Sequence, residues 1–134
     1  MHEKEIVIRW RDQDAYGHVN NAVYLTYAEE ARDAWIADVL GNDGDAWDYV
    51  TARVAIDFRR ELSLADESVV ARCSLVGIGN SSVTTHEEIL TRDGELAAEA
   101  EVVLVALDRV SGRSRPLTDR ERAAFERDLV ANAA

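Results

Sequence analysis

The order of apolar and polar positions predicts a strand and then a long helix at the start of the chain. Residues 5–11 alternate between the two kinds, and a period of two is typical of a strand. The apolar side of that strand is expected to consist of Ile6, Ile8 and Trp10. Over residues 22–40 apolar side chains recur at steps of three and four, which predicts one amphipathic helix of about five turns. Gly41, in the segment GNDG at 41–44, is expected to end it as a C-cap.

Beyond residue 50 the period of two returns. Four further strands are predicted, at residues 51–60, 67–79, 81–90 and 95–108. The first of them has an apolar face formed by Val54, Ile56 and Phe58. The alanines and glutamates of 95–108 would also suit a helix, but the Asp-Gly turn at 91–94 and the Val-Val-Leu-Val run favour a strand. A short helix capped by Thr118 is expected over 119–130.

This order of elements predicts an α+β fold, in which one long central helix is wrapped by a five-stranded antiparallel sheet, with a short helix at the C-terminal end. The 134 residues give room for a single domain, residues 1–134. One sheet can bury the apolar stripe of one helix, but its other face or an edge strand is left to be covered. A homodimer is therefore expected.

The composition narrows the choice of partners. Apolar residues make up 47% of the chain, and the formal net charge is −11. Because Lys and Arg bind phosphate backbones, this acidic balance argues against nucleic acid and against a basic membrane-surface helix. No apolar run has the length of a signal peptide or a membrane span, so a cytoplasmic protein is expected. Cys73 is the only cysteine, and no His/Cys spacing suggests a metal, so neither metal nor cofactor is predicted.

The segment DQDAYGHVNNAVY at 12–24 gathers short polar side chains in front of the long helix. The first N–H groups of a helix have no partner within it, and the macrodipole adds about half a positive charge there, so an oxyanion is stabilised at such a point. A turn at Gly17 can fold Asp14 back toward this end. A carboxylate beside free N–H donors can hydrolyse an acyl group, by attacking the carbonyl or by activating water. The same residues would also suit an ordinary capped helix start.

The string Asp-x-Asp-x-x-Gly-His-Val-Asn-Asn-x-x-Tyr at this point resembles the 4-hydroxybenzoyl-CoA thioesterase family of hotdog-fold acyl-CoA thioesterases. Further similarity lies in Glu-Glu-Ala-Arg at 29–32, in Arg-Arg at 59–60 before a LADE turn, and in Gly-Asn-Ser-Ser at 79–82. The resemblance covers about residues 5–110. It implies a hotdog fold, hydrolysis of an acyl-CoA, and a homodimer formed by extending the sheet, with dimers often joined into tetramers.

The resemblance also implies roles for single residues. By position, Asp14 matches the catalytic aspartate, and the backbone N–H of Asn21 matches the donor that polarises the thioester carbonyl. Gly17 is expected to let the backbone turn close to the thioester. The family's site lies at the dimer interface, and the residues expected to complete it from the second subunit are Ser81 and Ser82.

Several other side chains are assigned by their place in the motif. His18 is a candidate base because imidazole exchanges protons near neutrality, and packing against the loop is the alternative. Asp12 is expected to hold the loop, and Tyr24 to line the core or the substrate pocket. CoA carries several phosphate charges, so arginines are expected at the pocket rim. The candidates are Arg59 and Arg60, followed by Arg113 and Arg115.

One departure from some relatives leaves the thiol carrier open. The segment GIGNSS at 77–82 has no charge where those relatives place basic residues, so an acyl-carrier-protein thioester is an alternative to acyl-CoA. The same fold also serves dehydratases and non-catalytic acyl-CoA-binding proteins. Dehydratases of this fold usually rely on a histidine and carboxylate pair, whereas an aspartate ahead of GHVNN favours a hydrolase.

Overall fold

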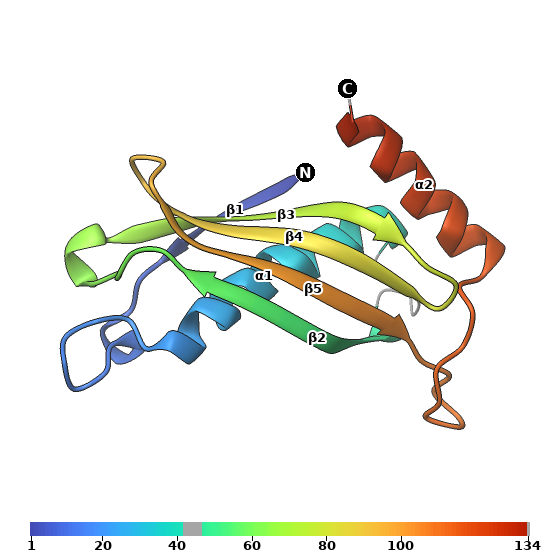
Figure 1. Cartoon of the computed structure of the whole chain (residues 1–134), viewed down its shortest axis with the longest axis horizontal. Helices are drawn as coiled ribbons and strands as arrows, with labels where there is room; N and C mark the ends of the chain where they lie inside the picture. The colour runs from blue at the N-terminus through green and yellow to red at the C-terminus, as the bar shows by residue number, and fades with distance from the viewer. Residues whose placement is uncertain (42–46, 134) are drawn as a thin grey trace.

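The computed structural model of the chain describes residues 1–41 and 47–133 (Figure 1). In chain order the helices and strands are β1 (His2–Val7), α1 (Asn21–Leu40), β2 (Tyr49–Phe58), β3 (Ser68–Ile78), β4 (Ser82–Thr91), β5 (Leu96–Ala106) and α2 (Asp119–Ala133). Short 3-10 turns lie at Trp10–Asp12 and Leu64–Asp66. The predicted order of one strand, a long helix, four strands and a C-terminal helix is confirmed. None of the described helices has the length and apolarity that a membrane span needs.

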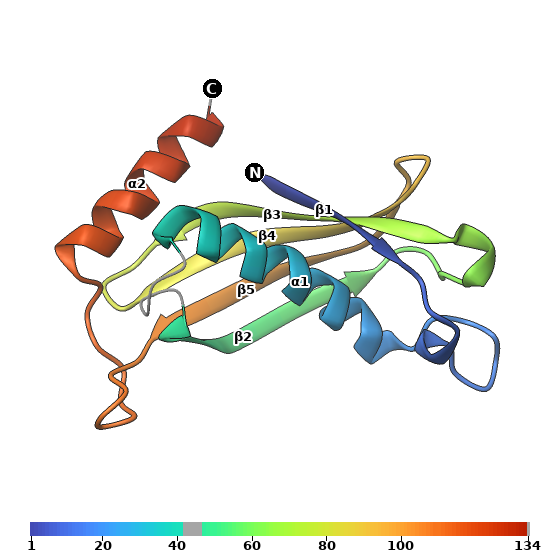
Figure 2. The same ribbon diagram turned by 180° about the vertical axis from the view of Figure 1, so that it is seen from behind.

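The five strands form one antiparallel sheet in the order β1-β3-β4-β5-β2. The helix α1 runs across one face of this sheet, here called the inner face, and Figure 2 shows it lying over the strands. This arrangement is the predicted α+β fold with a long central helix. One feature was not predicted: β2 does not pair with β3, the next strand in the chain, but crosses to the far edge and pairs with β5.

Burial along α1 follows the predicted apolar stripe. The buried residues of the helix are Tyr24, Tyr27, Ala28, Ala31, Arg32, Trp35, Ile36 and Leu40. They pack on alternate residues of the central strands, such as Ala71, Cys73 and Val102, which have no exposed surface. The Asn20 side chain caps the helix start, and Gly41 ends it with a positive φ of 84°, which glycine adopts without strain. The rest of the predicted GNDG stop, residues 42–44, lies outside the described residues.

The second helix is fastened to the inner face beside the C-terminal half of α1. Its start is a capping box, because Thr118 Oγ1 accepts the N–H of Glu121 at 3.1 Å while Glu121 accepts the N–H of Thr118 at 2.8 Å. Phe125 is fully buried and stacks on Trp35, with ring centroids 5.9 Å apart. The predicted cap at Thr118 is confirmed, and the helix covers the end of the inner face.

The first strand departs from the prediction. It ends at Val7, and Trp10 lies in a 3-10 turn with 79% of its surface exposed, whereas Ile6 and Ile8 are buried as expected. The reason is the carboxylate of Asp12, which accepts the backbone N–H of Arg9 at 2.9 Å and closes the chain into that turn. The alternating pattern therefore extends past the end of the strand, and the predicted strand at 5–11 wrongly included the turn that begins at Trp10.

Candidate functional site

Residues 13–19 form a closed turn directly before α1, here called the Asp14 turn. Gln13 and Val19 pair as an antiparallel bridge, and the N–H of Asp14 donates to the carbonyl of His18 at 2.8 Å. At the tip Gly17 has a φ of +81°, a conformation that side chains with a Cβ rarely adopt. The turn therefore folds Asp14 back on His18, two residues ahead of the helix cap.

The two oxygens of the Asp14 carboxylate have different surroundings. Oδ1 accepts the backbone N–H of Tyr16 at 2.9 Å and that of His18 at 3.3 Å, so it holds the turn together. For Oδ2 no hydrogen-bond donor is found in residues 1–41 and 47–133, and the side chain is partly exposed. One oxygen is thus structural, while the other has no protein partner among the described residues.

Beneath the turn, Asp12 supports the chain from inside, as expected. It is 2% exposed, and its Oδ2 accepts the hydroxyl of Tyr27 at 2.7 Å as well as the N–H of Arg9. Burial by itself would raise the pKa of Asp12, but the hydrogen bonds from Arg9 and Tyr27 outweigh it, and the pKa is lowered. Its backbone carbonyl accepts the N–H of Asn20 at 2.9 Å, which ties the loop to the helix start.

At the helix start some of the first backbone donors are satisfied locally and one is not. Asn20 Oδ1 accepts the N–H of Ala22 at 2.9 Å, which satisfies one of them. The N–H of Asn21 has no acceptor among the described residues, and its residue is exposed. This N–H lies at the positive end of the helix dipole, where an oxyanion is stabilised.

The two remaining candidates near the turn contact the segment that follows β2. His18 Nε2 lies 3.1 Å from a carboxylate oxygen of Glu61. The hydroxyl of Tyr24 donates to the carbonyl of Arg60 at 3.1 Å and accepts the N–H of Leu62 at 3.0 Å. Tyr24 is buried, which raises the pKa of its hydroxyl. The structure therefore brings both residues against segment 60–62 and places the Tyr24 ring in the core.

The arginines proposed for phosphate binding are mostly engaged with carboxylates. Arg59 lies 3.5 Å from Glu99, and Arg60 lies 3.1 Å from Asp66 and 3.0 Å from Glu95. Arg115 is part of a bidentate pair with Glu121, at 2.7 and 3.0 Å. Arg113 lies exposed in the loop between β5 and α2.

The predicted serines lie at the opposite end of the same protomer. Ser82 begins β4 and pairs with Val105 near the end of β5, and the carbonyl of Ser81 accepts the N–H of Ala106 at 2.9 Å. The Asp14 turn lies at the other end of α1 (Figure 1). Within one protomer the structure therefore brings together the turn and the helix start but not the serines.

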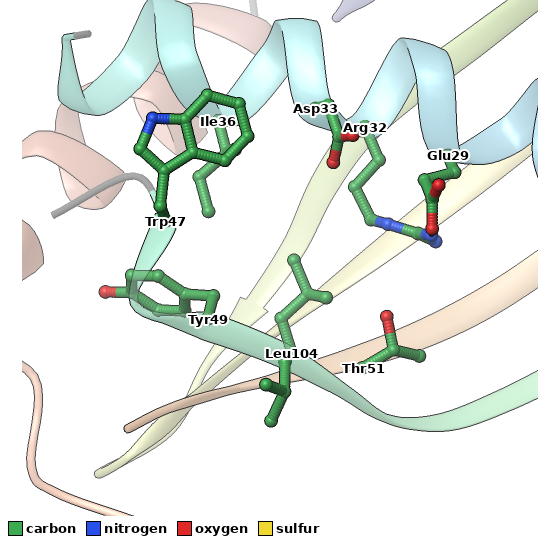
Figure 3. Close-up of a pocket in the computed structure, with 9 residues that line it drawn as sticks. Glu29, Arg32, Asp33, Ile36, Trp47, Tyr49, Thr51 and Leu104 are labelled. Carbon is green, nitrogen blue, oxygen red and sulfur yellow. The ribbon is translucent and has the colours of Figure 1, made fainter. Parts of the chain in front are cut away.

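Two adjoining cavities, of about 240 and 230 Å³, lie between α1 and β2. Both are lined by Glu29, Arg32 and Thr51. Figure 3 shows the first cavity, where Trp47 and Ile36 lie at one end and the Arg32 side chain runs toward Glu29 at the other. These lining residues were not predicted from the sequence as site residues. Alternation over 51–60 puts Thr51 on the face of Arg53, and only the register shift between these two residues turns Thr51 to the inner face opposite Leu104. No local signal marks Trp47.

The family of the chain follows from its sequence as a whole. A family model described as the Thioesterase-like superfamily matches residues 8–131. The chain belongs to the Thioesterase-like superfamily. The resemblance stated from the Asp14 motif is thereby confirmed, since the superfamily match covers the motif and both helices.

Three individual proteins that this chain resembles are also thioesterases by name. The chain is 29% identical over 132 residues to the long-chain acyl-CoA thioesterase FadM of Escherichia coli. The aligned region covers 92% of this chain and 96% of FadM. A thioesterase from Thermus thermophilus, whose crystal structure contains coenzyme A and zinc, is 32% identical with a TM-score of 0.85, over 96% of this chain and 94% of its own. A putative thioesterase from Pseudomonas aeruginosa, PA2801, is 29% identical with a TM-score of 0.78, covering 92% and 97%. The fold is the hotdog fold.

Proposed function

We propose that this protein is an acyl-CoA thioesterase that hydrolyses an acyl thioester to a free acid and CoA. The observation that carries the proposal is the Asp14 turn, where, within the described part of the chain, one carboxylate oxygen is unengaged ahead of a helix start whose Asn21 N–H has no acceptor. Membership in the superfamily supports it, as do the similarity to FadM, a long-chain acyl-CoA thioesterase, and the coenzyme A held by the Thermus relative.

The chemistry assigns one task to each group. The N–H of Asn21 donates to the thioester carbonyl and stabilises the oxyanion of the tetrahedral intermediate, a contribution of about 10²–10³ in rate for one such donor. Asp14 Oδ2 either attacks the carbonyl carbon, giving an anhydride that water then hydrolyses, or takes a proton from the water that attacks. The C–S bond breaks and the CoA sulfur leaves as a thiolate, which takes up the proton that Asp14 removed from water in the second route and a proton from solvent in the first. Gly17 keeps the turn free of side-chain atoms where the thioester approaches.

The second half of the site is proposed to come from a partner subunit. Within the described chain β2 pairs only with β5, so its outer edge can extend the sheet. On the inner face beside that edge Val54 and Phe58 are 37% and 45% exposed, although their cross-strand neighbours on β5 are buried. Pairing of β2 with a second β2 covers this apolar surface and gives a homodimer. Joining of dimers into tetramers is a further step of the same proposal.

The symmetry of such a pair predicts which residues meet. Two antiparallel copies of β2 place the Phe58 end of one strand beside the Tyr49 end of the other. The Phe58 ring packs against Tyr24 near the start of α1, with centroids 5.2 Å apart. At the other end of β2, Tyr49 pairs with Ala106, whose backbone N–H donates a hydrogen bond to the carbonyl of Ser81. The partner's Ser81 therefore lies at the same end of the dimer as the helix start of the first protomer, where it can contact the CoA part of the substrate and complete a composite site.

The acyl group is proposed to occupy the cavities between α1 and β2 (Figure 3). They follow the helix away from Asn21, since Leu25, Glu29 and Arg32 line them in turn. Their walls mix apolar side chains with the charged groups of Glu29 and Arg32. A partner subunit paired along β2 would close the open side.

The test is release of free thiol from a panel of acyl-CoAs of different length and aromaticity, followed with a thiol reagent. Asp14→Asn is expected to lose turnover by a factor of at least about 10³. Its amide oxygen can still accept the two N–H bonds that hold the turn, so the fold should be unchanged. Asp93→Asn, in the exposed turn between β4 and β5, is the matched control and should hydrolyse like the wild type.

Wild-type turnover by Asp14→Asn would overturn the assignment of this residue. Binding of acyl-CoA with no thiol release from any substrate would indicate a binding protein, and hydration of an enoyl-CoA without thiol release a dehydratase. Release only from acyl-carrier-protein substrates would indicate the other thiol carrier. In a single turnover in oxygen-18 water, label found in the Asp14 carboxylate requires direct attack, followed by hydrolysis of the anhydride at the Asp14 carbonyl.

A further inference from the structure

Arg122, on α2, lies against the turn that joins β3 to β4. Its Nη2 donates to the carbonyl of Gly79 at 3.0 Å and to that of Asn80 at 3.3 Å, across 43 and 42 positions of sequence. The turn is itself closed by the N–H of Gly79, which donates to the carbonyl of Ser82 at 2.7 Å. The guanidinium is therefore held at a fixed place beside the uncharged segment 77–82.

This arginine differs from most others in the chain because it has no carboxylate partner. The arginines that form ion pairs are Arg9, Arg32, Arg53, Arg59, Arg60, Arg72, Arg92, Arg109 and Arg115. For Arg122 no acidic group lies in salt-bridge range within residues 1–41 and 47–133, and its Nε and Nη1 have no acceptor there. The chain has a net charge of −11, yet no carboxylate among the described residues neutralises this guanidinium. Its positive charge and the N–H groups of Nε and Nη1 are therefore available to a ligand.

The position of Arg122 suits the far end of a CoA molecule, on the dimer described under the proposed function. Counted across the shared β2 edge, the partner's β4 is the third strand, which places it ~14 Å across the sheet from the first protomer's β2, at about 4.8 Å per strand. The pantetheine arm of CoA joins sulfur to phosphate through roughly 13 bonds, the length of about four extended residues, or ~15 Å. A thioester at Asn21 of one protomer thus brings the CoA phosphates to the β3–β4 turn of its partner.

We propose that the guanidinium of Arg122 binds a phosphate group of CoA for the active site of the opposite protomer. The inference rests on the proposed function. Its Nη2 stays on the turn carbonyls, while Nε and Nη1 donate charge-assisted hydrogen bonds to phosphate oxygens. The C-terminal helix thereby supplies the charge that the segment GIGNSS lacks.

The experiment compares the KM of Arg122→Gln for acyl-CoA with its KM for the same acyl group on pantetheine, which has no phosphate. The variant is expected to raise the KM for acyl-CoA about tenfold or more and to leave that for acyl-pantetheine unchanged, since hydrogen bonds to charged groups are among the stronger ones. Arg122→Lys should recover part of the loss. Arg127→Gln, an exposed arginine on the same helix with no ion pair in the described chain, is the control and should match the wild type.

Two results would overturn the inference. One is an unchanged KM of Arg122→Gln for acyl-CoA. The other is an equal loss with acyl-pantetheine, which would mean that Arg122 only shapes the β3–β4 turn. Calorimetric titration with CoA itself, on the wild type and the variant, needs no turnover. If the wild type binds CoA and Arg122→Gln binds it at least tenfold more weakly, the inference stands even where no thioester is hydrolysed; if the wild type binds no CoA, it falls.

Discussion

The buried ion pair between α1 and the sheet is open to a decisive test. Arg32 Nη1 lies 3.0 Å from Glu87 Oε1, with 8% and 1% of the two side chains exposed. The other carboxylate oxygen accepts the hydroxyl of Thr85 at 2.7 Å. Arg32→Met keeps an unbranched apolar stem of similar length but removes the only cation that lies beside Glu87 among the described residues. The carboxylate then stays buried without compensation for its charge.

The expected loss of unfolding free energy is about 3–5 kcal/mol, the typical cost of removing one partner of a buried pair. The loss should also depend on pH. Burial raises the pKa of Glu87 above its ordinary value of 4.5, and the charge of Arg32 acts against that rise, so the pKa rises further in Arg32→Met. A carboxyl whose pKa is raised by folding contributes stability that is complete below its unfolded pKa and is lost as the pH rises through its folded pKa. The deficit of the variant should therefore grow with pH.

The assay is urea unfolding at about pH 5 and about pH 8, at one protein concentration because a dimer's stability depends on it. The double variant Arg32→Met/Glu87→Met removes both charges and should recover most of the loss, since well-packed apolar residues replace buried pairs at little cost. A loss below about 1 kcal/mol in the single variant would refute the reasoning, as would a deficit equal at both pH values.

Two further predictions concern the fastening of α2 and the edge of the sheet. Burial would raise the pKa of Glu121, but its hydrogen bonds, those from Arg115 first, outweigh burial and lower the pKa to about 2. This carboxylate therefore stabilises the fold above its unfolded pKa, and the stabilisation is lost as the pH falls toward 2. Glu121→Gln should lose on the order of 2–3 kcal/mol near neutral pH, and the gap to the wild type in chemical unfolding should close in acid; a gap that widens in acid would contradict this. Val54→Glu places a charge on the exposed inner surface of β2 and should convert a dimer into a monomer in sedimentation or light scattering, with activity lost, whereas Val110→Glu, on a loop residue that is 98% exposed, should change neither. A dimeric Val54→Glu would exclude β2 as the interface.

Local pattern was enough for most of the elements. The steps of three and four over 22–40 gave α1 to within one residue of its start, because an amphipathic helix carries its period along its whole length. The Asp-Gly turn correctly decided that the alanine-rich segment is a strand, β5. The alternation failed at both ends of the first strand, which begins at His2 and ends before Trp10, where a side-chain hydrogen bond of Asp12 turned the chain. Period alone does not report such a bond.

The chemistry of the site divides in the same way. The sequence placed Asp14, Gly17 and Asn21 in one turn and helix start, because all three lie within eight positions and short contacts follow from local geometry. Which oxygen of Asp14 is engaged was visible only in the structure. The serines at 81–82 were expected in the same site, and in one protomer they lie at the opposite end of the fold.

The sequence by itself determined most of the helices and strands, the superfamily, and the motif in front of α1. Each of these depends on patterns of residues that are close together in the chain. Only the tertiary structure decided that β2 crosses to the free edge, that Arg32 meets Glu87 across 55 positions, and that Arg122 reaches the β3–β4 turn. The physical reason is that these contacts join residues far apart in the chain. Their geometry depends on how the whole sheet packs around α1, and no local period or propensity encodes that packing.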